Sequence, residues 1–86
     1  MEFPQYRVLE GAETLYVIEG PRHAVEFQPL GLKQWMPHAH VATDYPRFVW
    51  LQELQNETGH ARAISREGFL ELLQTREVRG ASSQLG

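Results

Sequence analysis

The sequence contains no cysteine, and this absence removes several classes of protein at once. Without cysteine there is neither a disulfide framework nor a thiolate metal site, so a disulfide-stapled secreted miniprotein is excluded. Long hydrophobic runs are also missing, because nothing approaches the roughly 20 apolar residues of a membrane span. The first residues carry Glu2 and Pro4 and are not followed by the apolar region of a signal peptide. We therefore expect a soluble protein of a reducing, cytoplasmic compartment.

Clustered basic charge is absent too. Eight Lys and Arg residues are scattered over 86 residues, and the net charge is −3. Nucleic-acid binding needs cations clustered tightly enough to displace counterions, so the composition disfavours it. Apolar residues make up 42% of the chain, which is too many for intrinsic disorder. We expect a single small α+β domain over residues 1–79, followed by a flexible tail over residues 80–86.

The N-terminal third has the clearest pattern in the sequence. Residues 5–9, 14–19 and 23–28 are rich in β-branched and aromatic types. Short segments with glycine, at 10–13 and 20–22, separate them and are typical of turns. The pattern predicts a three-stranded antiparallel meander, with one to three further strands possible in the rest of the chain.

The two hairpins of this meander can be drawn independently, and they agree. Both registers place Leu15 and Val17 on the same face of the sheet. The predicted pairs are Tyr6 with Val17, Val8 with Leu15, Val17 with Val25, and Leu15 with Phe27. The opposite face carries a mixture that suggests partial cover by a helix or by a partner subunit, namely Arg7, Leu9, Tyr16, Ile18, Ala24 and Glu26.

A helix is predicted near the C-terminus. Ser65 is a good N-cap, and Ile64 and Phe69 occupy the positions of a hydrophobic staple. Apolar residues then follow helical spacing to about Glu77, and Gly80 provides a stop. We expect this helix to cover the predicted face of the meander through Phe69 and Leu73.

The middle of the chain has no single pattern. Three prolines and a glycine interrupt residues 29–46, so an irregular stretch with a short strand near Val41 is expected. Residues 47–54 allow two interpretations. Asp44 and Pro46 are typical of a helix start, but the continuous apolar run that follows suits a doubly buried strand, which we favour.

Histidines provide the most suggestive chemistry. His38 and His40 would share one face of an extended strand, so both imidazoles could reach one Zn²⁺ or Fe²⁺ ion. His60 is the candidate third ligand, with Asp44 and His23 as alternatives. Because this spacing is unspecific, solvent-exposed or structural histidines are the favoured interpretation, and no cofactor is predicted.

Other catalytic chemistry has little support in the sequence, which favours a protein that is not an enzyme. No nucleophile elbow or phosphate-binding glycine loop is present. The serines are explained by the helix cap and the tail, and the close carboxylate pairs by a turn and a solvated helix face. These groups are Ser65, Ser82, Ser83, Glu10 with Glu13, and Glu67 with Glu71.

The two tryptophans are expected in different places, one at a binding surface and one in the core. Trp35 lies in the segment expected to be irregular, so we expect it to be exposed, and with Met36 and Tyr16 it forms the candidate partner-binding set. Trp50 lies within an apolar run and is expected in the core.

Three functions remain open from the sequence. The favoured one is a non-catalytic protein-interaction or regulatory module that uses a sheet face or edge, possible as a homodimer. The alternatives are a metal-binding protein or metal-dependent enzyme built on His38 and His40, and a single-stranded nucleic-acid binder.

Overall fold

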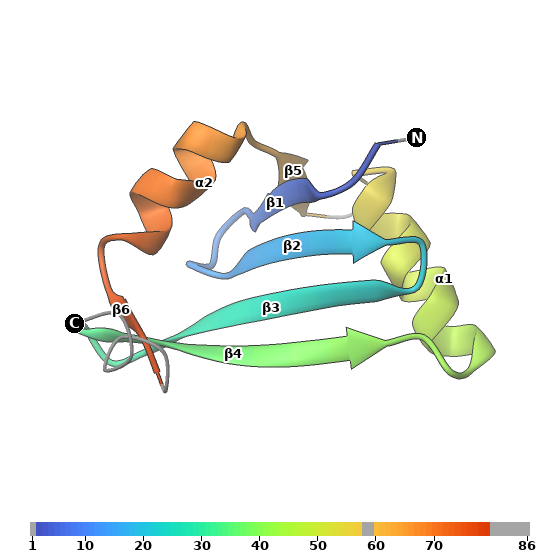
Figure 1. Ribbon diagram of the computed structural model, residues 1–86, viewed down its shortest axis with the longest axis horizontal. Coiled ribbons are helices and arrows are strands. Elements are labelled where there is room, and N and C mark those ends of the chain that lie inside the picture. Colours follow the sequence, from blue (N-terminus) through green and yellow to red (C-terminus); the bar gives the residue numbers. More distant parts are fainter. Residues whose placement is uncertain (1, 58–59, 80–86) are drawn as a thin grey trace.

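The computed structural model describes residues 2–57 and 60–79, and within them six strands form one sheet. The strand order is β5-β1-β2-β3-β4-β6, and every neighbouring pair is antiparallel except β4 with β6. Figure 1 shows β1 to β4 side by side as a meander. The predicted α+β class is therefore confirmed, and the predicted tail lies outside the described residues. The elements are β1 (Gln5–Leu9), β2 (Leu15–Gly20), β3 (His23–Leu30), β4 (Gln34–Val41), α1 (Tyr45–Gln55), β5 (Ala61–Ala63), α2 (Arg66–Leu73) and β6 (Glu77–Val78).

The registers predicted for the first two hairpins are confirmed. Leu15 and Val17 lie on the same face, as the alternation of side chains requires. The Cα partners are Tyr6 with Val17, Val8 with Leu15, Val17 with Val25, and Leu15 with Phe27.

Helix α2 covers this face and forms the first core. Ser65 caps the helix as predicted, because its Oγ accepts a hydrogen bond from the Gly68 N–H at 3.0 Å. Leu15, Trp35 and Phe69 are the buried members of the cluster. Partly buried side chains surround them, namely Tyr6, Val8, Val17, Phe27, Ile64, Leu70, Leu73 and Val78.

The helix is shorter than predicted. The Thr75 N–H and hydroxyl both donate to the Leu72 carbonyl, and bonds of this short span tighten and close the last turn. The chain then extends, and the Glu77 N–H donates to the Lys33 carbonyl. Residue 77, expected at the end of a helix, is therefore the first residue of β6.

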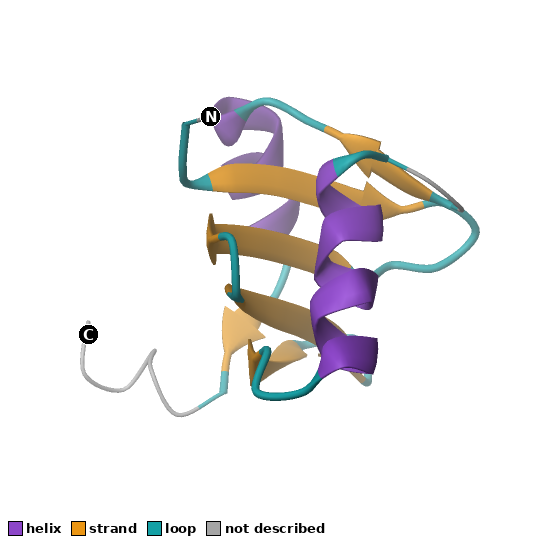
Figure 2. Ribbon diagram, turned by 90° about the vertical axis from the view of Figure 1, so that its right-hand side faces the viewer, coloured by secondary structure: helices purple, strands orange, loops and turns teal. Residues whose placement is uncertain are grey.

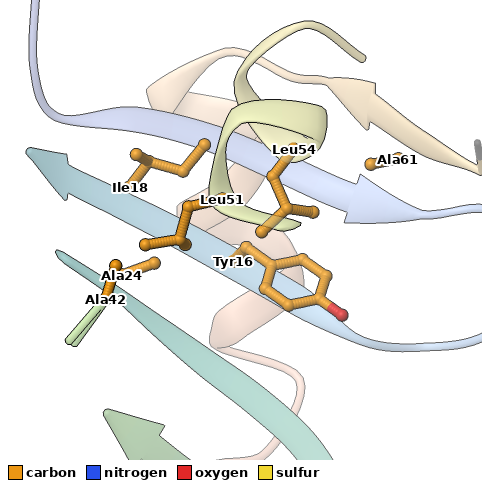
Figure 3. Close-up of a cluster of buried hydrophobic side chains, with 7 residues drawn as sticks. All are labelled: Tyr16, Ile18, Ala24, Ala42, Leu51, Leu54 and Ala61. Atoms are coloured by element: carbon orange, nitrogen blue, oxygen red, sulfur yellow. The ribbon is translucent and has the colours of Figure 1, made fainter. Parts of the chain in front are cut away.

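Residues 47–54 are helical, so the strand favoured from the sequence is wrong. The Asp44 carboxylate accepts a hydrogen bond from the Arg47 N–H at 2.9 Å, and Pro46 lies in the first turn, where proline is tolerated. The apolar run suggested a strand because, on a helix, its side chains point in several directions. In the structure, Leu51 and Leu54 of this helix nevertheless pack against the sheet (Figure 3).

This helix forms a second core on the opposite face of the sheet. The mixed face was expected to have partial cover, and α1 provides it. Figures 1 and 2 show the two helices at opposite ends of the long strands. The buried members are Tyr16, Ile18, Ala24, Ala42, Leu51, Leu54 and Ala61, with Phe3, Leu9, Phe48 and Trp50 packed against them.

A buried arginine joins β1 to the end of α1. Arg7 is only 6% exposed. Its Nε donates to the Leu54 carbonyl at 2.8 Å, and its Nη2 donates to the Gln55 carbonyl at 2.9 Å. The guanidinium therefore satisfies carbonyls that a helix C-terminus leaves without intrahelical donors.

The stretch expected to be irregular, residues 29–46, instead contains all of β4. Two of its prolines are accommodated within strands, because each lies where its strand is paired on one side only. Pro29 comes after the last partner pair of β2 with β3, and Pro37 comes after the last pair of β4 with β6. Proline cannot donate to a ladder, so these are the positions in which a strand tolerates it.

Candidate interaction surface

The outer edge of β4 is the clearest feature available for binding. The Trp35 carbonyl accepts from the Arg79 N–H, on the β6 side, whereas the Ala42 N–H donates to Arg22, on the β3 side. Successive residues of a strand direct their backbone groups to opposite edges. Pro37, Ala39 and Val41 therefore direct their backbone groups outward, away from β3.

Most of this edge has no neighbouring strand in the described part of the chain. β6 pairs only with Gln34 and Trp35, and β4 forms the lower border of the sheet in Figure 1. The Val41 carbonyl is occupied, because it accepts from the Thr43 N–H at 3.0 Å. Two donors, the N–H groups of Ala39 and Val41, and two acceptors, the carbonyls of Pro37 and Ala39, remain without a backbone partner among residues 2–57 and 60–79. We call residues 37–41 the open β4 edge.

The open β4 edge is also unusually free of charge. β4 has the sequence QWMPHAHV, without Asp, Glu, Lys or Arg, although 22% of the whole chain is charged. Edge strands are commonly protected from pairing by charged side chains, lysine above all. Val41 is 50% exposed at the end of the strand. Pro37 is the one protective residue here, and it removes a donor while leaving its carbonyl available.

A polar cluster lies behind this edge, on the α1 face of the sheet. His40 Nε2 is 2.8 Å from Glu26 Oε1, and the Gln28 side chain donates to the other Glu26 oxygen at 2.9 Å. Tyr16 also hydrogen-bonds to Glu26. Burial raises the pKa of Tyr16 to about 12, with further contributions from the Glu26 charge and this hydrogen bond. The cluster fixes the side chain of His40.

A hollow of about 690 Å³ adjoins the cluster. Its wall includes His40 and Trp50, whose ring centroids are 4.9 Å apart in an edge-to-face arrangement. Asp44, Pro46 and Arg47, from the start of α1, complete the lining. This hollow therefore opens beside the open β4 edge.

The predicted metal ligands are only partly brought together. His38 and His40 share one face of β4, as expected, because β3 pairs them with Glu26 and Ala24. His60 lies beside β5, at the other edge of the sheet, where its carbonyl accepts from the Glu10 N–H. Within residues 2–57 and 60–79, no three or more His, Asp or Glu residues are grouped to hold a metal ion. The metal site stays a prediction.

The candidate partner-binding residues lie deeper than expected. The exposure predicted for Trp35 is wrong, because the side chain is 2% exposed and its Nε1 donates to the Leu73 carbonyl at 2.9 Å. Tyr16 is buried in the second core, while Met36 is partly buried. Trp50, expected in the core, packs against the second core and is partly buried. Sequence reasoning expected only a short strand near Val41 and missed the rest of this edge, since Pro37 argued against a longer strand.

A second, smaller hollow lies at the α2 end of the sheet. It measures about 370 Å³, and Val8, Leu15 and Trp35 are among its lining residues. Arg76 borders it, lying 4.8 Å from the Trp35 ring and forming an ion pair with Glu13 at 2.6 Å. These contacts hold the end of α2 against the first core.

Comparisons with protein-family models, with curated proteins and with solved structures found no match to the chain. The fold defines an α+β protein built on a mostly antiparallel sheet. No helix in the described ranges has the length and apolar character needed to cross a membrane.

Proposed function

We propose that this chain is a protein-interaction module that binds an extended segment by strand addition along the open β4 edge. The observation that carries the proposal is the set of outward backbone groups on Pro37, Ala39 and Val41, which face no strand in the described part of the chain. In strand addition, main-chain hydrogen bonds supply affinity, and side chains on alternate residues supply specificity. The cytoplasmic location expected from the composition belongs to the same proposal.

β4 is already ordered in the conformation that a partner strand would need. All eight residues of β4 are paired with β3, so little backbone entropy remains to be lost when a segment binds. No Asp, Glu, Lys or Arg lies on β4, and His40 is held by Glu26. Binding would therefore add a strand without separating ion pairs.

A generic strand-forming peptide tests this proposal. The probe is a short synthetic peptide of alternating threonine and valine, with a lysine at each end, added at about 1 mM to about 20 µM protein. We expect the amide proton signals of Ala39 and Val41 to shift, because their N–H groups gain acceptors. No change at these amides, or equal changes at Ala61 and Ala63 of β5, would contradict the proposal.

Two substitutions at one position provide the matched control. Ala39→Pro removes the central outward donor and is expected to abolish the shift at Val41, whereas Ala39→Ser keeps the donor and is expected to retain it. Far-ultraviolet circular dichroism and the denaturation midpoint establish that both variants are folded. If Ala39→Pro unfolds the chain, Val41→Pro makes the same test at the end of the strand, read at Ala39.

A further inference from the structure

We propose that the occupant of the open β4 edge is a second copy of this chain, paired antiparallel about a two-fold axis between the two Ala39 residues. This inference rests on the proposed function and names its partner. It follows from the pattern of donors and acceptors along the edge, which is complementary to itself in one register. In a symmetric dimer the same patch is used on both copies.

The backbone groups match in that register. Ala39 faces the partner's Ala39, and the two residues exchange two N–H to carbonyl bonds, as a hydrogen-bonded antiparallel pair does. The Val41 N–H reaches the partner's Pro37 carbonyl, and symmetry repeats this bond. The one carbonyl left opposite a proline nitrogen is that of Val41, and it already accepts from Thr43. Every outward donor from 37 to 41 therefore meets an acceptor that has no other partner in the described part of the chain.

Neighbouring registers fit less well. Moving the partner by two residues toward its N-terminus places Ala39 opposite the partner's Pro37, so the Ala39 carbonyl faces a nitrogen without a hydrogen. Val41 then faces the partner's Trp35, whose carbonyl is bonded to Arg79. The opposite shift places Ala39 against the partner's Val41, whose carbonyl is taken by Thr43. Unmatched backbone groups that lose water cost free energy, so these registers are disfavoured.

The side chains are compatible with the same arrangement. On the α2 face, Val41 would lie beside the partner's Pro37, and the two Ala39 methyl groups would be neighbours. On the α1 face, His38 would lie beside the partner's His40, with Cα atoms about 4.5 Å apart in a pair of this type. Although each copy carries a net charge of −3, no Asp, Glu, Lys or Arg lies on β4 to repel its symmetry mate.

Oligomeric state is the first test. Size-exclusion chromatography with light scattering should show dimers at about 0.5 mM, a concentration suited to a small interface. Ala39→Pro removes both central donors of the dimer and is expected to weaken it at least about tenfold, whereas Ala39→Ser retains it. A chain that is monomeric throughout this range would overturn the inference.

Cross-linking tests the register. Because the chain has no cysteine, introduced thiols are the only ones present. Mixing His38→Cys with His40→Cys under oxidised glutathione should give a disulfide between the two variants, since these positions form a close pair. Each variant alone is expected to cross-link poorly, and Ala63→Cys on β5 serves as the control. Equal cross-linking of the single variants, or through residue 63, would overturn this register.

The outcomes separate this inference from the proposed function. A chain that stays monomeric but whose Val41 amide responds to the peptide would overturn the dimer and support the module. A dimer that Ala39→Pro leaves intact, with no response to the peptide, would overturn both proposals. Dimerisation lost in Ala39→Pro, together with cross-linking only in the mixed sample, would support both.

Discussion

At one border of the sheet, β5 is three residues long, and the outward N–H of Ala63 donates to the Glu57 side chain at 3.0 Å. Arg62 of this strand is 3.4 Å from Glu10. At the other border, β4 is eight residues long, carries no charged Asp, Glu, Lys or Arg, and is covered by β6 only at its start. The first border is short, charged and capped, while the second is long, has no acidic, lysine or arginine side chain, and is open over residues 37–41 in the described part of the chain.

Protection from edge-to-edge pairing is thus present at one border and reduced at the other. Glu57 has a positive φ of 58°, a conformation that few residues other than glycine adopt. This unfavourable backbone conformation occurs at the residue whose side chain accepts the hydrogen bond from Ala63 of β5. Since unprotected edges favour association, the comparison points to β4 as the border left open for a partner.

Replacing Trp35, at the start of β4 where β6 covers the edge, should have the largest effect on stability. Trp35→Ala deletes the buried ring, its bond to Leu73 and its contact with Arg76, so we expect a loss of about 3–5 kcal/mol in the free energy of unfolding. Trp35→Phe keeps an aromatic ring without the N–H and should lose less. Denaturant unfolding measures both. A loss below about 1 kcal/mol for the alanine variant would show that β6 and α2 do not depend on this ring.

Opening the protected border should have a smaller effect on stability. Glu57→Ala leaves the Ala63 N–H without its side-chain acceptor, so we expect a loss of about 1 kcal/mol. Hydrogen exchange at Ala63 should also become faster. Glu57→Gln keeps an acceptor oxygen and should restore slow exchange. If the alanine variant exchanges no faster than the original chain, the cap does not protect β5.

The smallest effect is expected in the cluster behind β4. Tyr16→Phe removes one hydrogen bond to Glu26, which keeps His40 and Gln28, so we expect a loss of about 0.5 kcal/mol at neutral pH. This prediction tests whether the cluster or the backbone holds the open border in place. Amide signals of Ala39 and Val41 that stay unchanged would identify the backbone pairing with β3 as sufficient.

Tyr16 also makes stability depend on alkaline pH. Its folded pKa is about 12, against an ordinary value of 10.0, so the folded chain holds this proton more tightly. The resulting stability is fully present below pH 10 and is lost as the pH rises toward 12. Unfolding measured at about pH 9 and about pH 11 should show a steeper decline for the original chain than for Tyr16→Phe. Parallel declines would contradict the raised pKa.

Local patterns predicted some parts of this molecule well and others poorly. The meander was predictable because alternation of Leu15 and Val17 with polar or opposite-face residues fixes strand register. The α2 cap was predictable because Ser65 acts within its own turn. Only the end of β4 near Val41 was predicted as a strand. The rest was not, since Pro37 is tolerated only because no strand of the described part pairs with it on its outer side. The proposed binding surface depends on that same spatial arrangement.

The strand favoured for residues 47–54 was wrong for a related reason. Their apolar side chains suit either a strand or a helix, and the outcome depends on contact with Tyr16 and Ile18 from a distant segment. Trp35 was misplaced because its partners, Leu73 and Arg76, come from the far end of the chain. Long-range contacts decide these positions, and local sequence does not contain them.

Arg7 links the end of α1 to β1, a strand far from α1 in the sequence. An isolated eleven-residue helix is marginal in water, and the terminal carbonyls of α1 receive donors from a guanidinium on β1. A peptide cut out around this helix would lack that closure and should be largely unfolded. The last turn of α1 and the first strand are therefore expected to melt together, as a single cooperative unit.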